Sequence, residues 1–114
     1  MWKVILRDGT ILEEGKHSFL SINRRDIKYL IIMKNNKEVL RLENPENRNI
    51  LFYQKSRAVN ILSGRISDII EEAGMYIGDN KFLVYYVYPN GQIVKREEEK
   101  YPQFYEIHKI DREE

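Results

Sequence analysis

The chain has 114 residues, 42% of them hydrophobic, and its 19 Lys and Arg against 18 Asp and Glu give a net charge of +1. This apolar content excludes a wholly disordered chain, the balanced charge argues against a strong binder of duplex DNA, and the absence of cysteine excludes a disulfide scaffold, a thiolate metal site and a cysteine nucleophile. A chain of this length is expected to form one domain, residues 1–114, with a single core.

The chain opens with the alternation of polar and apolar residues that is typical of β-strands. Residues 2–7 alternate with a period of two, so their side chains point to opposite faces of a sheet. Asp8 and Gly9 follow, and this dipeptide predicts a hairpin turn because the turn needs a positive φ, which glycine adopts without strain. Residues 11–14 are the expected partner strand, so the protein is predicted to begin with a β-hairpin.

A second hairpin and a further strand are expected in the first half of the chain. Residues 27–34 are rich in isoleucine and tyrosine, and the polar stretch 34–37 predicts a turn. Residues 38–43 return with alternating charged and apolar side chains, which is typical of a strand with one solvated face. After a loop rich in asparagine, residues 50–53 are predicted as the next strand.

The spacing of apolar residues changes from two to three and four over residues 56–75, which is typical of a helix. We expect a short helical turn near 57–63 and a helix near 67–73, with Gly64 and Gly74 at the positions of C-terminal caps. The isoleucines in the second window also suit a strand, because β-branched side chains favour extended backbone. A strand in this segment is therefore the alternative.

A tyrosine-rich strand is expected near the end of the chain. Residues 82–88 are apolar on both faces, and the Pro-Asn-Gly sequence at 89–91 predicts a turn into a returning strand over 92–96. A strand with two apolar faces needs cover on both sides. We predict that it forms part of the contact of a homodimer or higher homo-oligomer, with Tyr85, Tyr86 and Tyr88 near that contact; the alternative is a buried central strand of a monomer.

These elements together predict an α+β fold, with a mostly antiparallel sheet of six to eight strands built from hairpins and one or two short helices in 56–75. No apolar stretch approaches the roughly 20 residues that a membrane span needs. The first residues also lack the basic and apolar regions of a signal peptide. We therefore expect no membrane association and a cytoplasmic location.

The sequence contains no motif that fixes a catalytic or metal-binding chemistry. His17 and His108 lie far apart and have no carboxylate at ligand spacing, so no metal site is expected. No nucleophile motif and no phosphate-binding glycine loop occurs. The adjacent Glu97, Glu98 and Glu99 project to alternate faces of a strand, which is poor geometry for a paired acid and base. We therefore expect a protein that is not an enzyme and needs no cofactor.

Charge is distributed unevenly along the chain. Residues 1–60 hold 12 Lys and Arg against 7 Asp and Glu, a net charge of +5, whereas residues 61–114 hold 7 against 11, a net charge of −4. Such a division either gives one positive face or reflects pairing of charges within the protein. The basic segment contains the cations Arg24, Arg25, Lys28, Arg41, Arg48, Lys55 and Arg57 and the aromatic residues Tyr29, Phe52 and Tyr53.

This combination suggests a nucleotide site, because arginine forks bind phosphate oxygens through two donors and aromatic rings stack on bases. Arg57 is the first candidate, since it follows a strand end where Ser56 can cap the next turn and backbone donors can converge on phosphate. The complete set of candidate ligand-binding residues is Arg57, Arg48, Tyr53, Arg25 and Lys55. The alternative interpretation is that the aromatic residues belong to the core and the cations form a solvated face.

Three stretches, residues 2–10 (WKVILRDGT), 51–59 (LFYQKSRAV) and 74–78 (GMYIG), carry a resemblance to known proteins. Together they resemble small, mostly uncharacterised proteins carried by bacteriophages and prophages. Many such accessory proteins act against host defence, and one class sequesters cyclic nucleotide signals without cleaving them. The resemblance implies a phage origin and an anti-defence role in the cytoplasm of a bacterial host cell.

The leading hypothesis is a non-enzymatic binding protein that sequesters a small anionic, nucleotide-like signal, cyclic or linear, or a host factor. The alternatives are a single-stranded nucleic-acid-binding module and a protein inhibitor that plugs a host enzyme. These hypotheses differ in the surface that they require: a concave pocket with converging arginine and aromatic groups, an open basic groove, or a flat exposed apolar patch.

Overall fold

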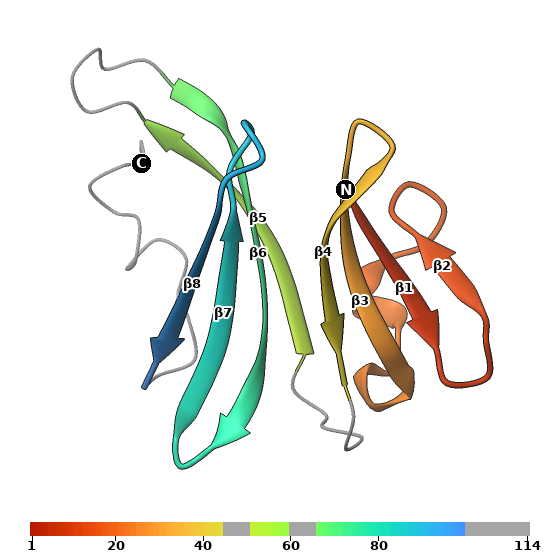
Figure 1. Ribbon diagram of the computed structural model, residues 1–114. Helices are drawn as coiled ribbons and strands as arrows, with labels where there is room; N and C mark the ends of the chain where they lie inside the picture. Colours follow the sequence, from red (N-terminus) through yellow and green to blue (C-terminus); the bar gives the residue numbers. More distant parts are fainter. Residues whose placement is uncertain (45–50, 60–65, 100–114) are drawn as a thin grey trace. The chain divides into compact units, whose positions relative to one another are not determined.

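The computed structural model of the protein describes the greater part of the chain. The described residues are 1–44, 51–59 and 66–99, of which 56–59 and 66–69 are described by their backbone. Within them the chain forms two four-stranded sheets and two single-turn 3-10 helices (Figure 1). The expectation of a mostly antiparallel sheet is confirmed, since every strand pair whose register is described is antiparallel.

Two compact units, Met1–Tyr53 and Gln54–Glu114, divide the chain. Strand β5 (Leu51–Val59) begins in the first unit and continues into the second. The expectation that residues 1–114 form one domain stays a prediction. None of the helices in the part of the chain that the structure describes is long and apolar enough to cross a membrane.

The first unit contains a four-stranded sheet with the strand order β2-β1-β3-β4. Its strands are β1 (Trp2–Leu6), β2 (Ile11–Glu13), β3 (Ile27–Lys34) and β4 (Lys37–Glu43). Between β2 and β3 the chain makes two short 3-10 helices, η1 (Phe19–Ser21) and η2 (Arg24–Asp26). Both hairpins that the sequence predicted in this region, β1–β2 and β3–β4, are confirmed.

Alternation along these strands assigns one face of the first sheet to the core. Val4 of β1 pairs with Leu30 of β3, and Leu30 pairs with Leu42 of β4, so the three side chains share a face. All three are buried, and Trp2, which pairs with Ile32, extends the same apolar face. A slip of one residue would turn these side chains to the opposite face, so their burial fixes the register.

The second sheet has the strand order β5-β6-β7-β8. After β5, its strands are β6 (Ile66–Gly78), β7 (Lys81–Val87) and β8 (Ile93–Glu98). A two-residue turn joins β6 to β7, and its residues Asp79 and Asn80 have φ values of 53° and 59°. The tyrosine-rich strand and the returning strand that the sequence predicted correspond to β7 and β8 and are confirmed.

The turns β1–β2 and β7–β8 share one hydrogen-bond pattern around an Asx-Gly pair. In the first of them, Leu6 N donates to Thr10 O at 2.8 Å, and Thr10 N donates to Asp8 Oδ1 at 2.9 Å. The equivalent bonds occur in the second turn. Gly9 and Gly91 occupy the same place in the two turns, with φ values of 93° and 89°, as the sequence predicted.

The helix predicted near 67–73 and its cap at Gly74 are wrong, because these residues belong to strand β6, and the described residues contain no α-helix of the predicted α+β fold. Of the helical turn predicted near 57–63, residues 57–59 belong to β5, and the others lie outside the described residues. The spacing was misleading because β6 is buried on both faces from Ile70 to Met75, so burial there shows no period of two. Pairing with β7 and the preference of isoleucine for extended backbone outweigh the helical spacing.

Candidate functional site

The five residues predicted from the sequence as ligand contacts lie on different elements, and two of their side chains are outside the described residues. Arg48 and the side chain of Arg57 lie outside the described residues. Lys55 is exposed on β5, Arg25 is exposed in η2, and Tyr53 is half-buried. Whether these five residues form one site stays a prediction. The described contacts instead gather a different set of charged and aromatic side chains, on β3 and β4 of the first unit.

Tyr53 belongs to an aromatic cluster in the first unit. Its ring centroid lies 6.4 Å from that of Trp2 and 5.9 Å from that of Phe19, and Trp2 and Phe19 meet edge to face at 5.4 Å. The Tyr53 hydroxyl donates to Glu14 Oε1 at 3.3 Å. Because Trp2 and Phe19 are buried, this cluster continues the core. Packing therefore accounts for the position of Tyr53 without a ligand.

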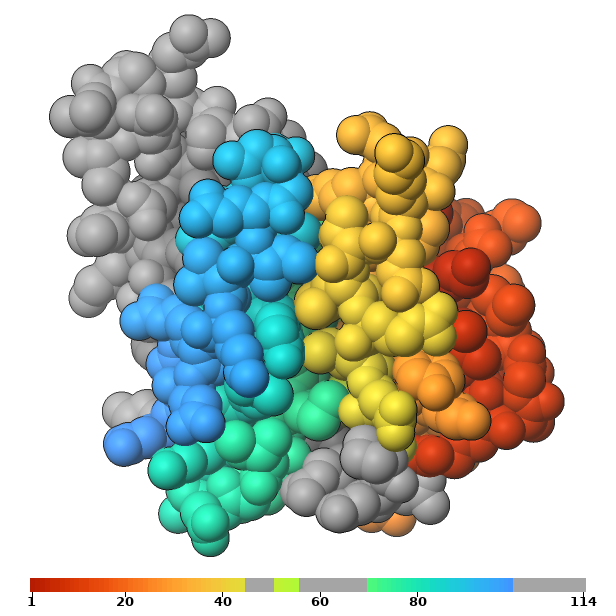
Figure 2. All heavy atoms as spheres, in the orientation of Figure 1, coloured from red at the N-terminus to blue at the C-terminus, as the bar shows by residue number. Residues whose placement is uncertain are grey.

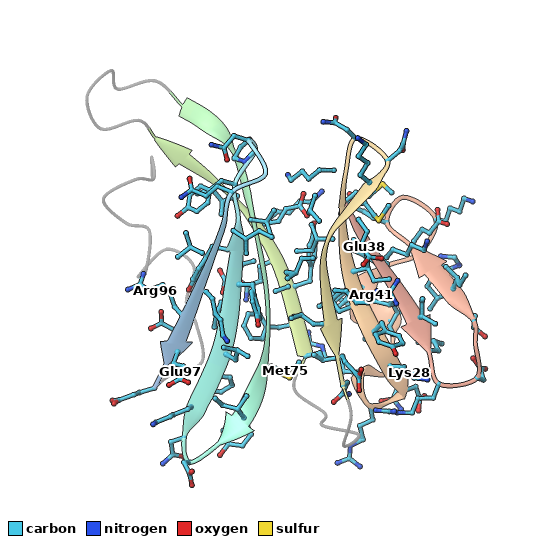
Figure 3. All side chains as sticks on the ribbon, in the orientation of Figure 1. Lys28, Glu38, Arg41, Met75, Arg96 and Glu97 are labelled. Atoms are coloured by element: carbon cyan, nitrogen blue, oxygen red, sulfur yellow. The ribbon has the colours of Figure 1, made fainter. Side chains whose placement is uncertain are left out.

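The clearest combination of cations and aromatic surface lies on the face of the first sheet opposite the core. The guanidinium carbon of Arg41 lies 4.8 Å from the ring centroid of Tyr29, and Nζ of Lys28 lies 5.5 Å from the same centroid. Both distances are within the range of cation–π attraction, about 6 Å. Together with Glu38, these residues form what we call the cation–tyrosine cluster. Figure 2 shows the β3–β4 hairpin at the molecular surface, and Figure 3 labels the charged members of the cluster.

Glu38 holds the guanidinium of Arg41 through two hydrogen bonds. Arg41 Nε donates to Glu38 Oε2 at 3.0 Å, and Arg41 Nη2 donates to Glu38 Oε1 at 2.7 Å. These bonds lower the pKa of Glu38 and raise the pKa of Arg41, so both groups are charged at neutral pH. About two fifths of each side chain is exposed, 42% for Arg41 and 41% for Glu38. The cluster is therefore ordered and open to solvent at the same time.

A third cation, Lys3 of β1, lies on the same outer face. Lys3 and Arg41 pair with Ile31 from its two sides, and Ile31 is only 1% exposed. Long cationic side chains cover apolar neighbours with their methylene stems while the charged ends reach water. The pKa of Glu38, lowered first by the Arg41 hydrogen bond, is lowered further by the charge of Lys3. The outer face thus combines a covered apolar row with both cations and carboxylates, because Glu13 pairs with Lys3 and Glu43 pairs with Tyr29.

Two further arginines of this unit are positioned by the segment before β3. The guanidinium of Arg24 lies 5.6 Å from the ring centroid of Phe19. Arg25 is held through its backbone, because Arg7 Nε donates to the Arg25 carbonyl at 3.2 Å and Arg7 Nη2 donates to the carbonyl of Asn44. Arg7 thereby ties η2 to the end of β4. The exposed side chain of Arg25 adds a cation next to the start of β3.

In the second unit, carboxylates and a tyrosine gather on one face of β6, β7 and β8. Glu72 pairs with Tyr86 across the sheet, and both side chains are buried. On the same face of β8, Arg96 Nε lies 3.4 Å from Glu98 Oε1. Burial raises the pKa of the Tyr86 hydroxyl, and the negative charges of Glu72 and Glu98 raise it further. Tyr86 is therefore neutral across the physiological pH range.

A hollow of about 560 Å³ lies at the β6–β7 turn. The rings of Tyr76 and Phe82 meet edge to face in it with their centroids 5.3 Å apart, and Asn80 N donates to the Tyr76 hydroxyl at 3.3 Å. Its charged lining consists of Lys81 against the carboxylates Asp79 and Glu99. This balance of charge does not favour an anion, so the hollow fits the sequence-based hypothesis less well than the cation–tyrosine cluster does.

The described residues contain no group of three or more His, Asp or Glu side chains placed to hold a metal ion. His17 Nδ1 accepts a hydrogen bond from the backbone N of Glu13 at 3.3 Å, which closes the loop after β2. His108 lies outside the described residues. The imidazole of His17 therefore has a local structural contact in the first unit.

Lys28, Tyr29 and Arg41 belong to the basic segment of the sequence but are not among the ligand contacts predicted from it. The signal that would have found them is the alternation in the β3–β4 hairpin. Leu30 and Leu42 pair with each other and belong to the core face. Tyr29 and Arg41, each one residue before them in its strand, must therefore both face outward, where they are diagonal neighbours. A cation and a tyrosine on facing strands with one solvated face are close enough to interact.

No family model matches the sequence, and neither a curated protein nor a solved structure was found that matches it. The resemblance to phage accessory proteins, and the anti-defence role that it implies, therefore stay predictions.

Proposed function

We propose that the protein is a non-enzymatic binding protein that captures a nucleotide-like anion on the outer face of its first sheet. The observation that supports this proposal is the cation–tyrosine cluster, in which Arg41 and Lys28 both contact the ring of Tyr29. Cations beside an aromatic ring can bind both parts of a nucleotide, since the positive charge binds phosphate and the flat ring stacks on a base. Removal of a signal nucleotide is the anti-defence role that we propose for it.

The outer face carries Lys3, Lys28 and Arg41 together with the carboxylates Glu13, Glu38 and Glu43. The support for an anionic ligand therefore comes from Lys28 rather than from a net charge of the face. Lys28 is exposed and its Nζ lies 5.5 Å from the ring centroid of Tyr29, so its ammonium group can reach a phosphate oxygen. Lys3 lies on the same face, and Arg25 is exposed next to the start of β3. A hydrogen bond from such a cation to phosphate contributes about 1.5–3 kcal/mol.

A second candidate function is the binding of single-stranded nucleic acid. The observation that favours it is that the cluster lies on a sheet face formed by neighbouring strands, with part of Arg41 exposed. Open sheet faces with aromatic and cationic side chains bind successive nucleotides of a strand through stacking and phosphate contacts. In that case the affinity should increase with the length of the strand.

Calorimetric titration of the full chain with mono-, di- and cyclic dinucleotides and with oligonucleotides of increasing length tests both candidates. Lys28→Ala should weaken binding by roughly tenfold or more, from the loss of one charged hydrogen bond. Lys37→Ala is the matched control, because Lys37 is an exposed lysine of the same hairpin outside the cluster. If no compound gives heat, or if both variants bind equally, the proposal is wrong and binding of a host protein becomes the leading hypothesis.

A further inference from the structure

We propose that Arg41 is a stacking surface for the base of the ligand rather than a clamp for its phosphate, and that Glu38 is the positioning residue that keeps it so. This inference rests on the proposed function and assigns separate tasks to the members of the cation–tyrosine cluster. Lys28 then supplies the charge that attracts phosphate.

Glu38 occupies one edge of the Arg41 guanidinium. Arginine binds a phosphate or carboxylate most strongly through two parallel N–H donors. In Arg41 the donors Nε and Nη2 already point to the two carboxylate oxygens of Glu38, at 3.0 and 2.7 Å. A phosphate at this edge would have to displace Glu38. A phosphate that left Glu38 in place could reach only the Nη1–Nη2 end of the guanidinium, beside the negative charge of Glu38. Glu38 also balances the charge of Arg41, so the pair offers an anion little net attraction.

The guanidinium of Arg41 also contacts an aromatic ring. Tyr29 lies against the guanidinium of Arg41, with 4.8 Å from the guanidinium carbon to the ring centroid. The side chain of Arg41 is still 42% exposed. A guanidinium that a carboxylate holds at one edge and whose carbon lies over a ring is pre-organised, so a base that stacks on it has to immobilise few additional rotatable bonds. Arginine planes serve in this way when proteins stack unpaired bases.

The tests use variants that separate shape from charge. Arg41→Lys keeps the charge and removes the plane, so it should weaken binding of adenine and guanine nucleotides about tenfold. It should leave the affinity for ribose 5-phosphate, which has no base, unchanged. Lys28→Ala should weaken both kinds of compound. It should also reduce the dependence of affinity on salt, which Arg41→Lys leaves unchanged, because phosphate contacts are screened by ions.

Glu38→Gln decides the role of the positioning residue, with Glu43→Gln as the control. Both substitutions remove one negative charge from the outer face of β4, and Glu43, which is the cross-strand partner of Tyr29, makes no described contact with Arg41. We expect Glu38→Gln to bind nucleotides more weakly than Glu43→Gln, because the guanidinium loses its orientation. If Glu38→Gln instead binds nucleotides and ribose 5-phosphate more tightly than the control, Arg41 is a phosphate clamp and the inference is overturned.

The failure of this inference can be told apart from the failure of the proposed function. If nucleotides bind and Lys28→Ala weakens them while Arg41→Lys and Arg41→Ala bind as the wild type does, the stacking role is refuted and the proposed function stands. If the wild type binds no nucleotide, both are refuted. The emission of Trp2, the sole tryptophan, provides a folding check for each variant, because Trp2 is buried in the same unit.

Discussion

Tyr53 allows a direct test of whether an aromatic residue of this protein serves the core or a ligand. Its ring lies 6.4 Å from Trp2 and 5.9 Å from Phe19, and its hydroxyl donates to Glu14. Tyr53→Ala removes all three contacts, whereas Tyr53→Phe removes the hydrogen bond alone. The two substitutions therefore separate ring packing from the polar contact.

The expected magnitudes follow from burial. Truncation of a fully buried large aromatic residue to alanine costs about 3–5 kcal/mol. Because Tyr53 is half-buried, we expect Tyr53→Ala to lower the free energy of unfolding of the first unit by about 2 kcal/mol. Tyr53→Phe should cost roughly 0.5–1.5 kcal/mol, the net value of one hydrogen bond.

Urea titration with Trp2 emission as the probe measures these losses, because Trp2 is the sole tryptophan and is in contact with the substituted ring. With a denaturant slope of about 1–2 kcal/mol per molar, Tyr53→Ala should lower the urea midpoint by roughly 1–2 M. Lys37→Ala is the control, since Lys37 is exposed at the start of β4 in the same unit and its substitution should change stability by less than about 0.5 kcal/mol.

An unchanged midpoint for Tyr53→Ala would refute the packing argument. If nucleotide binding were lost at the same time, Tyr53 would have to be counted among the ligand contacts, as the sequence analysis proposed. We expect the opposite result. In the absence of urea, where Tyr53→Phe is folded, its affinity for nucleotides should equal that of the wild type.

Two further predictions concern a turn and a buried hydroxyl. Gly9→Val should destabilise the protein by about 1 kcal/mol or more, because the φ of 93° at this position is strained for any L side chain. Steric overlap is not the cause, since a Cβ at this position meets no atom within 4 Å. An unchanged melting temperature would contradict this prediction. The pKa of Tyr86 is raised in the folded protein, first by burial, so its contribution to stability is complete below the ordinary tyrosine pKa near 10 and is lost as the pH rises above it. The free energy of unfolding of Tyr86→Phe should therefore fall less steeply than that of the wild type between about pH 10 and 12. Circular dichroism measures unfolding at each pH, and equal slopes for the two proteins would disprove the assignment.

Local signals in the sequence predicted the hairpins, because turn chemistry and alternation act over a few residues. Gly9 and Gly91 were placed at positive φ on that basis, and the structure agrees. The segment of β6 could not be predicted in the same way. Burial on both faces from Ile70 to Met75 removes the alternation that identifies a strand, and it depends on what packs there rather than on the segment itself.

The candidate site was predictable in its chemistry but not in its membership. Cations and aromatic residues of the basic segment were recognised, yet their spacing does not tell which face of a sheet becomes core. Tyr53 packs against Trp2 and Phe19 at the edge of the core. The register of β3 with β4 instead places Tyr29 and Arg41 on the solvent-facing side of the sheet. These outcomes depend on tertiary contacts, which no short window of sequence contains.

The two-residue turns bear on the order of folding. Asn35 and Asn36 join β3 to β4 with φ values of 51° and 62°, and the β6–β7 turn has the same form. Hairpins with such short connections form in about 1–10 μs, since few residues must be ordered before the strands meet. Strand β1 instead pairs with β3, and the pairing of Trp2 with Ile32 closes a much longer loop of the chain. We therefore expect the addition of β1 to a preformed β3–β4 hairpin to limit the folding rate of the first unit.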